Sequence, residues 1–114
     1  MNKSTTNLAT SIDSLTEFVS DAVIICDLDF KIQDWNRGAQ EIYGWKTHEV
    51  FDKPIDEVLR TRYTYDPPQK VKEAILEANF WEGVFLQKHK TGGHRYVSAM
   101  ISLLFDSEGN PEGA

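Results

Sequence analysis

The strongest constraint on the fold is an alternating stretch, residues 95–105, in which both sets of alternate residues are rich in apolar side chains. One set is Val97, Ala99, Ile101, Leu103 and Phe105, and the other contains Tyr96, Met100 and Leu104. Successive side chains of a β-strand point to opposite faces of its sheet. Neither face of this strand can therefore simply lie in water, and the sequence predicts a sheet that is covered on both sides.

A second predicted strand, residues 83–90, precedes this one, and Thr91-Gly92-Gly93 joins the two. Glycine adopts the positive φ angles that tight turns require. Residues 83–105 are therefore predicted to form a β-hairpin.

An apolar seam near the N-terminus is the available cover for the second face. Its residues recur with steps of four, three and four, which places them on one stripe of a helix: Leu8, Ile12, Leu15 and Val19. A helix of about 12 residues is marginal in water, so it must dock. In the alternative reading the helix begins at Ser14, which forms a capping box with Glu17. We expect a helix and dimer seam made by Leu8, Ile12, Leu15 and Val19 with Tyr96, Met100 and Leu104.

The segment from Ala22 to Gly44 carries the signals of a hairpin followed by a short helix. Residues 22–26 and 31–35 are predicted strands on either side of an Asp27-Leu28-Asp29 turn. Asn36 is a good N-cap for a helix that ends at Gly44, the residue type that most often adopts the left-handed conformation.

Further helices are predicted between this hairpin and the second one. Thr47 is expected to cap a single turn, and Pro54 to begin a helix through Leu59. A longer helix is expected to have Asp66 as its cap and Pro67 as its first residue. Its buried stripe is Val71, Ala74, Ile75 and Ala78.

Length and charge indicate one domain, which we expect to span residues 21–114. Residues 1–20 before it are expected to form a polar arm and an amphipathic helix. The chain has 114 residues and a formal net charge of −6. Scattered lysines and arginines argue against nucleic acid and against an anionic membrane surface as partners. A lone Cys26 forms no internal disulfide, which favours a reducing, cytoplasmic location. The longest apolar run, residues 22–26, is too short to cross a bilayer.

No set of residues forms a recognisable catalytic or metal site, so the sequence predicts a protein that is not an enzyme. His48 and Glu49 resemble the start of a zinc-protease helix, but Asp52 stands where its second histidine belongs. Cys26 lies within an apolar strand, where a thiol is neutral and inert. His89 and His94 flank a glycine turn, where exposed polar residues are ordinary.

Several segments in order resemble the PAS family. They are Asp21-Ala22-Val23-Ile24-Ile25-Cys26-Asp27, Lys31-Ile32-Gln33-Asp34-Trp35-Asn36-Arg37-Gly38-Ala39, Ile42-Tyr43-Gly44-Trp45 with Glu49-Val50, Trp81-Glu82-Gly83, Lys88-His89-Lys90-Thr91-Gly92-Gly93 and Asp106-Ser107-Glu108-Gly109-Asn110-Pro111. The resemblance implies an α+β fold with a five-stranded antiparallel sheet and helices on one face. Its last strand should follow Pro111, between the first and fourth strands, so residues 21–114 are expected to lack this C-terminal strand. We expect one of two outcomes. Either another segment or a partner completes the sheet, or the first strand closes imperfectly on the fourth.

The resemblance also limits the cofactor. Light-oxygen-voltage relatives use a reactive cysteine in a helix, whereas Cys26 is on the first predicted strand. Haem-binding relatives use a histidine of the long helix, and residues 67–79 contain none. We expect a filled core without cofactor, and a non-covalent flavin or small organic ligand is the alternative. The residues expected to line a cavity are Ile25, Tyr43, Val71, Ile75, Phe85, Val97 and Ile101.

The function implied is that of a sensory and dimerisation module of a multidomain signalling protein. PAS domains commonly precede a histidine kinase, as in two-component systems, or another signalling domain. We expect a homodimer that couples the sheet to these neighbouring domains and has no catalytic activity of its own. The alternative is a redox sensor that binds flavin or another small ligand.

Overall fold

The computed structural model describes residues 21–114. The predicted N-terminal helix, its seam residues Leu8, Ile12, Leu15 and Val19, and the Ser14 capping box lie outside the described residues.

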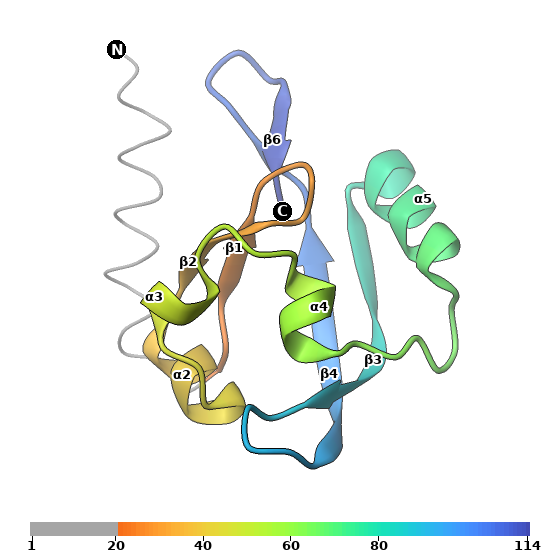
Figure 1. The fold of residues 1–114 in the computed structure, drawn as a ribbon. Helices are drawn as coiled ribbons and strands as arrows, with labels where there is room; N and C mark the ends of the chain where they lie inside the picture. The colour runs from red at the N-terminus through yellow and green to blue at the C-terminus, as the bar shows by residue number, and fades with distance from the viewer. Residues whose placement is uncertain (1–20) are drawn as a thin grey trace.

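The described chain alternates short strands and helices, with one longer helix and one long hairpin (Figure 1). The elements in order are β1 (Ile24–Cys26), β2 (Ile32–Trp35), α2 (Arg37–Tyr43), α3 (Thr47–Val50), α4 (Ile55–Leu59), α5 (Pro68–Ala78), β3 (Phe80–Lys88), β4 (His94–Ser102), β5 (Leu104–Phe105) and β6 (Pro111–Gly113). None of the helices between residues 21 and 114 is both long and apolar enough to cross a membrane.

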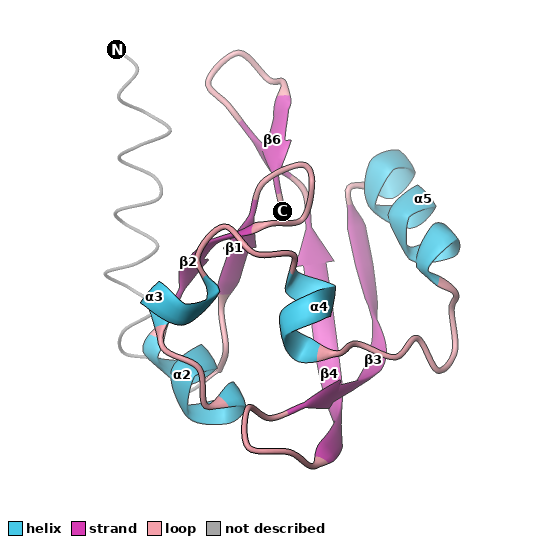
Figure 2. Cartoon of the chain, in the orientation of Figure 1, coloured by secondary structure: helices cyan, strands magenta, loops and turns pink. Residues whose placement is uncertain are grey.

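The strands pair antiparallel as β1 with β2, β3 with β4 and β5 with β6 (Figure 2). The predicted hairpin is confirmed, since β3 and β4 pair continuously from Phe80 opposite Ser102 to Lys88 opposite His94. Strand β6 is the start of the expected last strand. The next residue, Ala114, exchanges two backbone hydrogen bonds with Cys26 of β1, of 2.7 and 3.0 Å. These residues therefore lie between β1 and β5, where the last strand was expected.

The expected single strand through Phe105 is interrupted at Leu103. The Leu103 N–H still donates to the carbonyl of Asn79 at 3.0 Å, in the register of the β3–β4 ladder. Asn79 ends α5 with a φ of 63°. The ladder ends there because Asn79, with its left-handed backbone, belongs to the end of α5, and β5 then pairs with β6.

Two apolar clusters form the core. The first joins β1 and β2 to the three short helices, with Ile32, Trp35, Val50 and Leu59 almost fully buried. The second joins α5 to the β3–β4 hairpin and consists of Val71, Ile75, Trp81 and Phe85. Helix α5 thus packs on the face of the hairpin that carries Trp81 and Phe85. Of the predicted apolar stripe of α5, Val71 and Ile75 are buried.

Helix α2 begins and ends as predicted. The Asn36 side chain accepts from the Ala39 N–H at 2.9 Å and from the Val23 N–H at 2.8 Å, so it caps α2 and holds the start of β1. Gly44 ends the helix with a φ of 82°. The expected cap of α3 was wrong, because Lys46 takes the N-cap position and Thr47 is the first helical residue.

The start of α5 also differs from the prediction by one residue. Pro67 occupies the N-cap and Pro68 the first helical position, and no side chain caps the helix. The Asp66 carboxylate instead accepts from the Trp81 indole N–H at 3.1 Å and lies 3.8 Å from the Lys70 ammonium. The predicted cap is therefore used to tie the loop before α5 to β3.

The close approach of β6 to β1 makes a testable prediction at Gly113. A Cβ added to Gly113 would lie 2.2 Å from the Cys26 carbonyl oxygen, which is backbone and cannot swing away. We expect Gly113→Ala to lower the free energy of unfolding by about 1–3 kcal/mol, as overpacking does. For a domain of this size that lowers Tm by about 4–8 °C per kcal/mol, measured by circular dichroism.

Glu112→Ala is the matched control for this variant. Glu112 is in the same strand, and its truncation adds no atom beside β1. An unchanged Tm in Gly113→Ala would contradict the observed pairing of this segment with β1.

Candidate ligand-binding site

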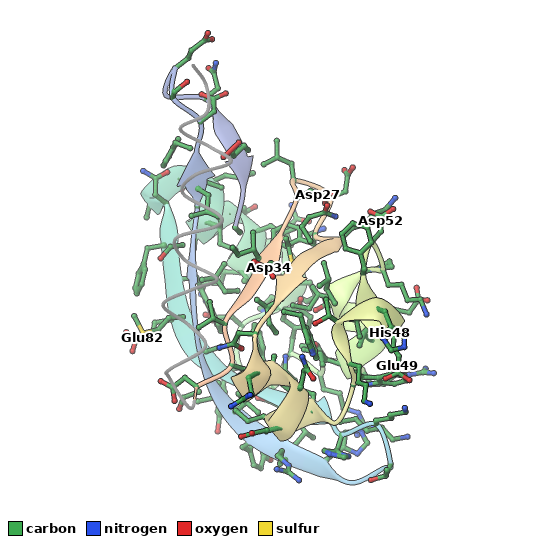
Figure 3. The ribbon with its side chains drawn as sticks, turned by 90° about the vertical axis from the view of Figure 1, so that its left-hand side faces the viewer. Asp27, Asp34, His48, Glu49, Asp52 and Glu82 are labelled. Atoms are coloured by element: carbon green, nitrogen blue, oxygen red, sulfur yellow. The ribbon has the colours of Figure 1, made fainter. Side chains whose placement is uncertain are left out.

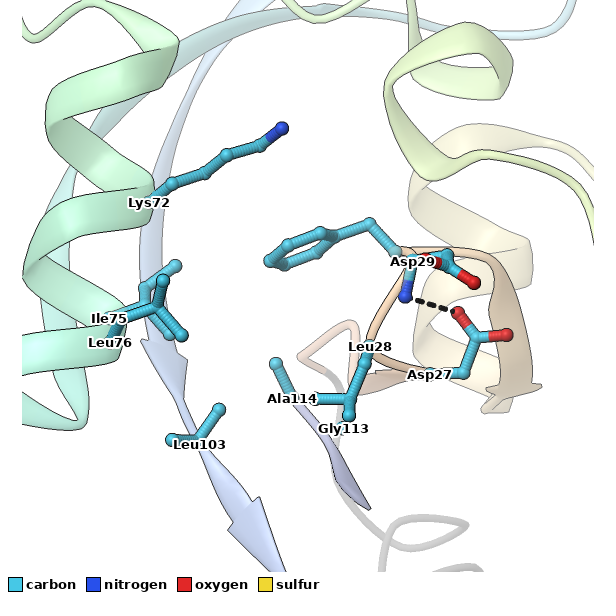
Figure 4. A pocket seen from close by; sticks show the side chains of 10 residues that line it. Asp27, Leu28, Asp29, Lys72, Ile75, Leu76, Leu103, Gly113 and Ala114 are labelled. Atoms are coloured by element: carbon cyan, nitrogen blue, oxygen red, sulfur yellow. Dashed lines mark hydrogen bonds between the residues drawn. The ribbon is translucent and has the colours of Figure 1, made fainter. Parts of the chain in front are cut away.

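A hollow of about 290 Å³ opens between the β1–β2 turn, α5 and β6 (Figure 4). We call it the outer hollow. Its walls are mainly apolar, and its lining is Asp27, Leu28, Asp29, Phe30, Lys72, Ile75, Leu76, Leu103, Gly113 and Ala114.

A smaller cavity of about 70 Å³, the inner cavity, adjoins it beneath α5. Phe30, Lys72 and Ile75 line both spaces. The other residues of the inner cavity come from α4, α5, the loop between them and the β3–β4 hairpin: Asp56, Tyr63, Val71, Phe85 and Ile101. The two spaces therefore form one candidate site in two parts.

The turn between β1 and β2 is held by its own hydrogen bonds. The Asp27 carboxylate accepts from the backbone N–H groups of Asp29 and Lys31, both at 2.9 Å. The Phe30 N–H donates to the Asp27 carbonyl at 3.0 Å, and the Phe30 carbonyl accepts from the Ile55 N–H at 3.0 Å. The backbone that carries the Phe30 ring is thus fixed on both sides.

Aromatic rings form the far wall of the inner cavity. Phe85 stacks on Trp81 with centroids 4.8 Å apart and meets the edge of Tyr63 at 5.1 Å. The Tyr63 hydroxyl donates to the Asp56 carboxylate. Burial raises the pKa of Tyr63, and the hydrogen bond to Asp56 raises it further. Two of the three polar side chains of this cavity, Tyr63 and Asp56, are therefore paired with each other, and the third is Lys72.

A buried amide on the same face of β3 is also fully engaged. Gln87 accepts from the Tyr43 hydroxyl at 2.6 Å and donates to the Thr61 hydroxyl at 3.2 Å. Burial raises the pKa of Tyr43 to about 12. This network joins α2 to the hairpin and leaves neither the amide nor the phenol free for a ligand.

Four of the seven residues expected to line a cavity do so: Val71, Ile75, Phe85 and Ile101. Tyr43 is buried in the other cluster instead, and Ile25 and Val97 line neither space. Residues that the sequence reasoning missed are Phe30, Lys72, Leu28 and Leu76. A comparison of the loop 27–31 with the loop 106–110 could have singled out Phe30, because glycine stands at the matching position, Gly109.

The inner cavity does not fit a flavin. Ligand pockets usually have volumes of about 300–1,000 Å³, and this one has about 70 Å³. Within residues 21–114, the only buried side-chain polar atom without a partner is the Trp45 indole nitrogen, which lines neither space. Among the described residues that line this cavity, Tyr63 and Asp56 are bonded to each other, and the Lys72 ammonium is in neither ion pair.

Acidic and histidine side chains do not converge on a metal site in the part of the chain that the structure describes. Figure 3 shows Asp27, Asp34 and Glu82 on three separate elements, with His48 and Glu49 on α3. The Glu49 carboxylate contacts the Lys90 ammonium at 2.7 Å, and Lys90 also lies over the Trp45 ring, 5.1 Å from its centroid. These side chains fasten α3 to the turn of the hairpin.

Cys26 is a buried core residue of β1. Burial chiefly, with the charges of Asp27 and Asp56, raises the pKa of its thiol from 9.0 to about 12. The thiol is therefore neutral in the folded protein at physiological pH. Because the folded pKa is the higher one, this group stabilises the fold fully below pH 9 and loses that contribution as the pH rises toward 12.

Protection of this thiol is testable with a thiol-reactive chromogenic disulfide. With a pKa of about 12 only about one thiol in 10,000 is ionised at pH 8, against about one in ten at a pKa of 9.0. We expect Cys26 to react slowly in buffer at pH 8 and rapidly in guanidinium chloride, as followed by absorbance. A fast reaction of the folded protein would contradict the buried position of Cys26.

Comparison with solved structures places this architecture among known folds. The PAS domain of a protein from Colwellia psychrerythraea aligns with a TM-score of 0.75 and 21% identity over 93% of this chain and 90% of that one. An RNA-binding light-oxygen-voltage receptor aligns with a TM-score of 0.76 and 14% identity over 93% of this chain and 31% of that one. A light-oxygen-voltage domain studied with a flavin analogue aligns with a TM-score of 0.72 and 22% identity, over 90% of this chain and 78% of that one. At these identities the likeness shows the fold alone.

Sequence comparison gives the family. No curated protein matches the chain. The sequence model of the PAS fold matches residues 16–114, which include the whole described part. The chain therefore belongs to the PAS family of sensory signalling modules.

Proposed function

We propose that this PAS domain is the sensory input and dimerisation module of a larger cytoplasmic signalling protein, such as a two-component sensor histidine kinase. In this role it is not a catalyst. It passes a change in its own packing to the domains beside it. The observation that carries the proposal is the apolar outer face of the β3–β4 hairpin.

This outer face is the side of the hairpin that points away from the core. Tyr96 is 68% exposed and Met100 is 69% exposed. Tyr96 lies opposite Leu86, and Ser102 lies opposite Phe80, which is 40% exposed. Leu104 of β5, the third expected seam residue of this region, is half-buried. Large apolar side chains gathered on an exposed sheet face are typical of an interaction surface.

The occupant that we propose is the apolar seam of residues 8–19. Its four side chains, Leu8, Ile12, Leu15 and Val19, fit one stripe of an amphipathic helix. Packed over Tyr96 and Met100, the helix would remove both side chains from water. A second copy of the same helix would complete a symmetric dimer, which is the commonest form of soluble homo-oligomer.

Charged substitutions on the outer face and on the seam test this dimer. We expect Tyr96→Glu with Met100→Glu, and separately Leu15→Asp with Val19→Asp, to raise the dimer dissociation constant at least about tenfold, since each pair removes apolar contacts and buries charge. Sedimentation equilibrium measures this constant.

Tyr65→Asp is the matched control, because Tyr65 is an aromatic residue 75% exposed in the loop before α5. The dimer dissociation constant of Tyr65→Asp is expected to equal that of the unaltered protein. A chain that stays monomeric at micromolar concentration, or a dimer that survives both double substitutions, would refute the proposal.

A flavin-binding redox sensor is the competing function. The small inner cavity and its paired polar groups argue against it. We expect purified protein to be colourless and to take up no added riboflavin in equilibrium dialysis. A visible absorption band that co-purifies with the protein would instead support the redox sensor.

A further inference from the structure

Among the described strands only β4 pairs with β3, and the other edge of β3 is partly covered by loops (Figure 1). Leu86 exchanges two backbone hydrogen bonds with Arg62 across this edge, of 2.8 and 3.1 Å. Just beyond the strand, the Lys90 N–H donates to the Tyr43 carbonyl at 2.8 Å. Successive residues of a strand point their N–H and C=O groups to alternate sides. The even-numbered residues of β3 therefore point away from β4.

Three residues at the start of β3 leave their outward groups unpaired. Phe80, Glu82 and Val84 alternate in step with Leu86, and no described residue bonds to their N–H or C=O groups on the side away from β4. The odd-numbered Asn79 points the other way, since its carbonyl accepts from the chain that continues β4. We call residues 80–84 the free edge. An unpaired strand edge is a template for pairing with another chain.

Two side chains draw the loop before α5 away from this edge. The ring of Tyr63, next to Arg62, meets the ring of Phe85 on the inner face of the hairpin. The Asp66 carboxylate accepts from the indole N–H of Trp81, on the same face, at 3.1 Å. Because both contacts lie on the inner face, the loop leaves the plane of the sheet after Arg62. The start of β3 is therefore left without a neighbour in the described structure.

The side chains beside the free edge determine which strand fits it. Phe80, Glu82 and Val84 lie on the outer face, and Phe80 is 40% exposed. Glu82 is exposed, is in neither ion pair of the described residues, and has Met100 opposite it in β4. Directly opposite side chains of neighbouring strands contact each other. An anion between two apolar side chains thus fits a strand that has a cation between two apolar side chains.

We propose that the free edge binds an extended segment of another protein as an added antiparallel strand, with a lysine or arginine opposite Glu82 and apolar residues opposite Phe80 and Val84. The antiparallel direction continues that of the bridge between Arg62 and Leu86. Main-chain hydrogen bonds supply the affinity of such strand addition, and alternate side chains supply its selectivity. The edge lies in the plane of the sheet, so this surface is separate from the outer face of the proposed dimer and does not depend on it.

A second copy of the free edge is a poor occupant. Only even-numbered residues of both copies can bond to each other, because only they point outward. In every such register within residues 80–84, Glu82 lies opposite Glu82, Phe80 or Val84 of the second copy. Opposed carboxylates repel, and a carboxylate against an apolar side chain gains no partner. The cation that Glu82 lacks must therefore come from a different sequence.

Hydrogen exchange of the amides, followed by NMR on the full chain, tests the free edge itself. We expect the amides of Glu82 and Val84 to exchange at least about tenfold faster than those of Gly83 and Phe85, which point toward β4. Equal exchange rates in the two pairs would show that the edge is already paired, and would overturn the proposal.

The probe for the added strand is the synthetic peptide acetyl-Thr-Val-Thr-Lys-Thr-Val-Thr-amide. We expect it to bind saturably and to slow exchange at Glu82 and Val84, since its lysine and valines would donate to the free edge. Methylation of both valine nitrogens removes two of these donors and is expected to weaken binding at least about tenfold. Methylation of the two threonine nitrogens beside lysine is the matched control, because these point away from β3, and it should change the affinity less than about twofold.

Two substitutions in β3 test the backbone and the charge separately. Val84→Pro removes an outward N–H that the fold does not use, as edge strands tolerate, and is expected to weaken peptide binding at least about tenfold. Val84→Ala keeps this N–H and is its control. Glu82→Lys is expected to reverse the preference, so that a peptide with glutamate in place of lysine binds about three- to tenfold better than the lysine peptide.

No saturable binding of the lysine peptide, or equal affinity of the two methylated peptides, would overturn the proposed strand addition. A higher dimer dissociation constant in Val84→Pro would also overturn it, because a second copy would then occupy the free edge. If circular dichroism shows that Val84→Pro does not fold, the charge reversal in Glu82→Lys carries the test. Sedimentation equilibrium of the unaltered chain reports the seam dimer separately, so failure of one surface is distinguishable from failure of the other.

Discussion

The Phe30 ring holds the two halves of the core together. Among the described residues it is the one partly buried side chain packed against both apolar clusters. One cluster contains the first hairpin and the three short helices, and the other contains α5 and the second hairpin. Hydrogen bonds of the β1–β2 turn and of Ile55 hold the backbone of Phe30 in place. A ring on a strained backbone thus lies between the two clusters, and the two spaces of the candidate site lie beside it.

Elements with local signals were predictable from the sequence. The Asn36 cap, the Gly44 end of α2 and the β3–β4 hairpin depend on residues a few positions apart, and the structure confirms them. The start of α5 was wrong by one residue because Asp66 bonds to Trp81, 15 positions away. The break at Leu103 lies where its ladder partner is Asn79, the left-handed residue that ends α5. Local patterns fix the type of an element, whereas tertiary contacts fix its ends.

The candidate site was predictable only in part, for the same reason. Helical and strand periodicity identified Val71, Ile75, Phe85 and Ile101, because these residues face the core wherever their elements pack. Phe30 looked like an ordinary turn residue. Only Gly109, at the matching position of loop 106–110, indicates its positive φ, and nothing in the sequence places its ring between two clusters. Lys72 is on the exposed side of the predicted stripe, and only the placement of α5 against the β1–β2 turn brings it to the hollow.

The geometry of β4 connects the inner cavity with the proposed dimer face. Ile101 lines the inner cavity, and its neighbour Met100 is on the outer face where the seam is proposed to dock. Because adjacent residues of a strand face opposite sides, a displacement of β4 that makes room at Ile101 also moves the surface at Met100. A ligand changes the dimer only if it binds the two packings of the hairpin with different affinity. A ligand confined to the outer hollow would not contact Ile101, so only occupancy of the inner cavity would reach the dimer face through β4.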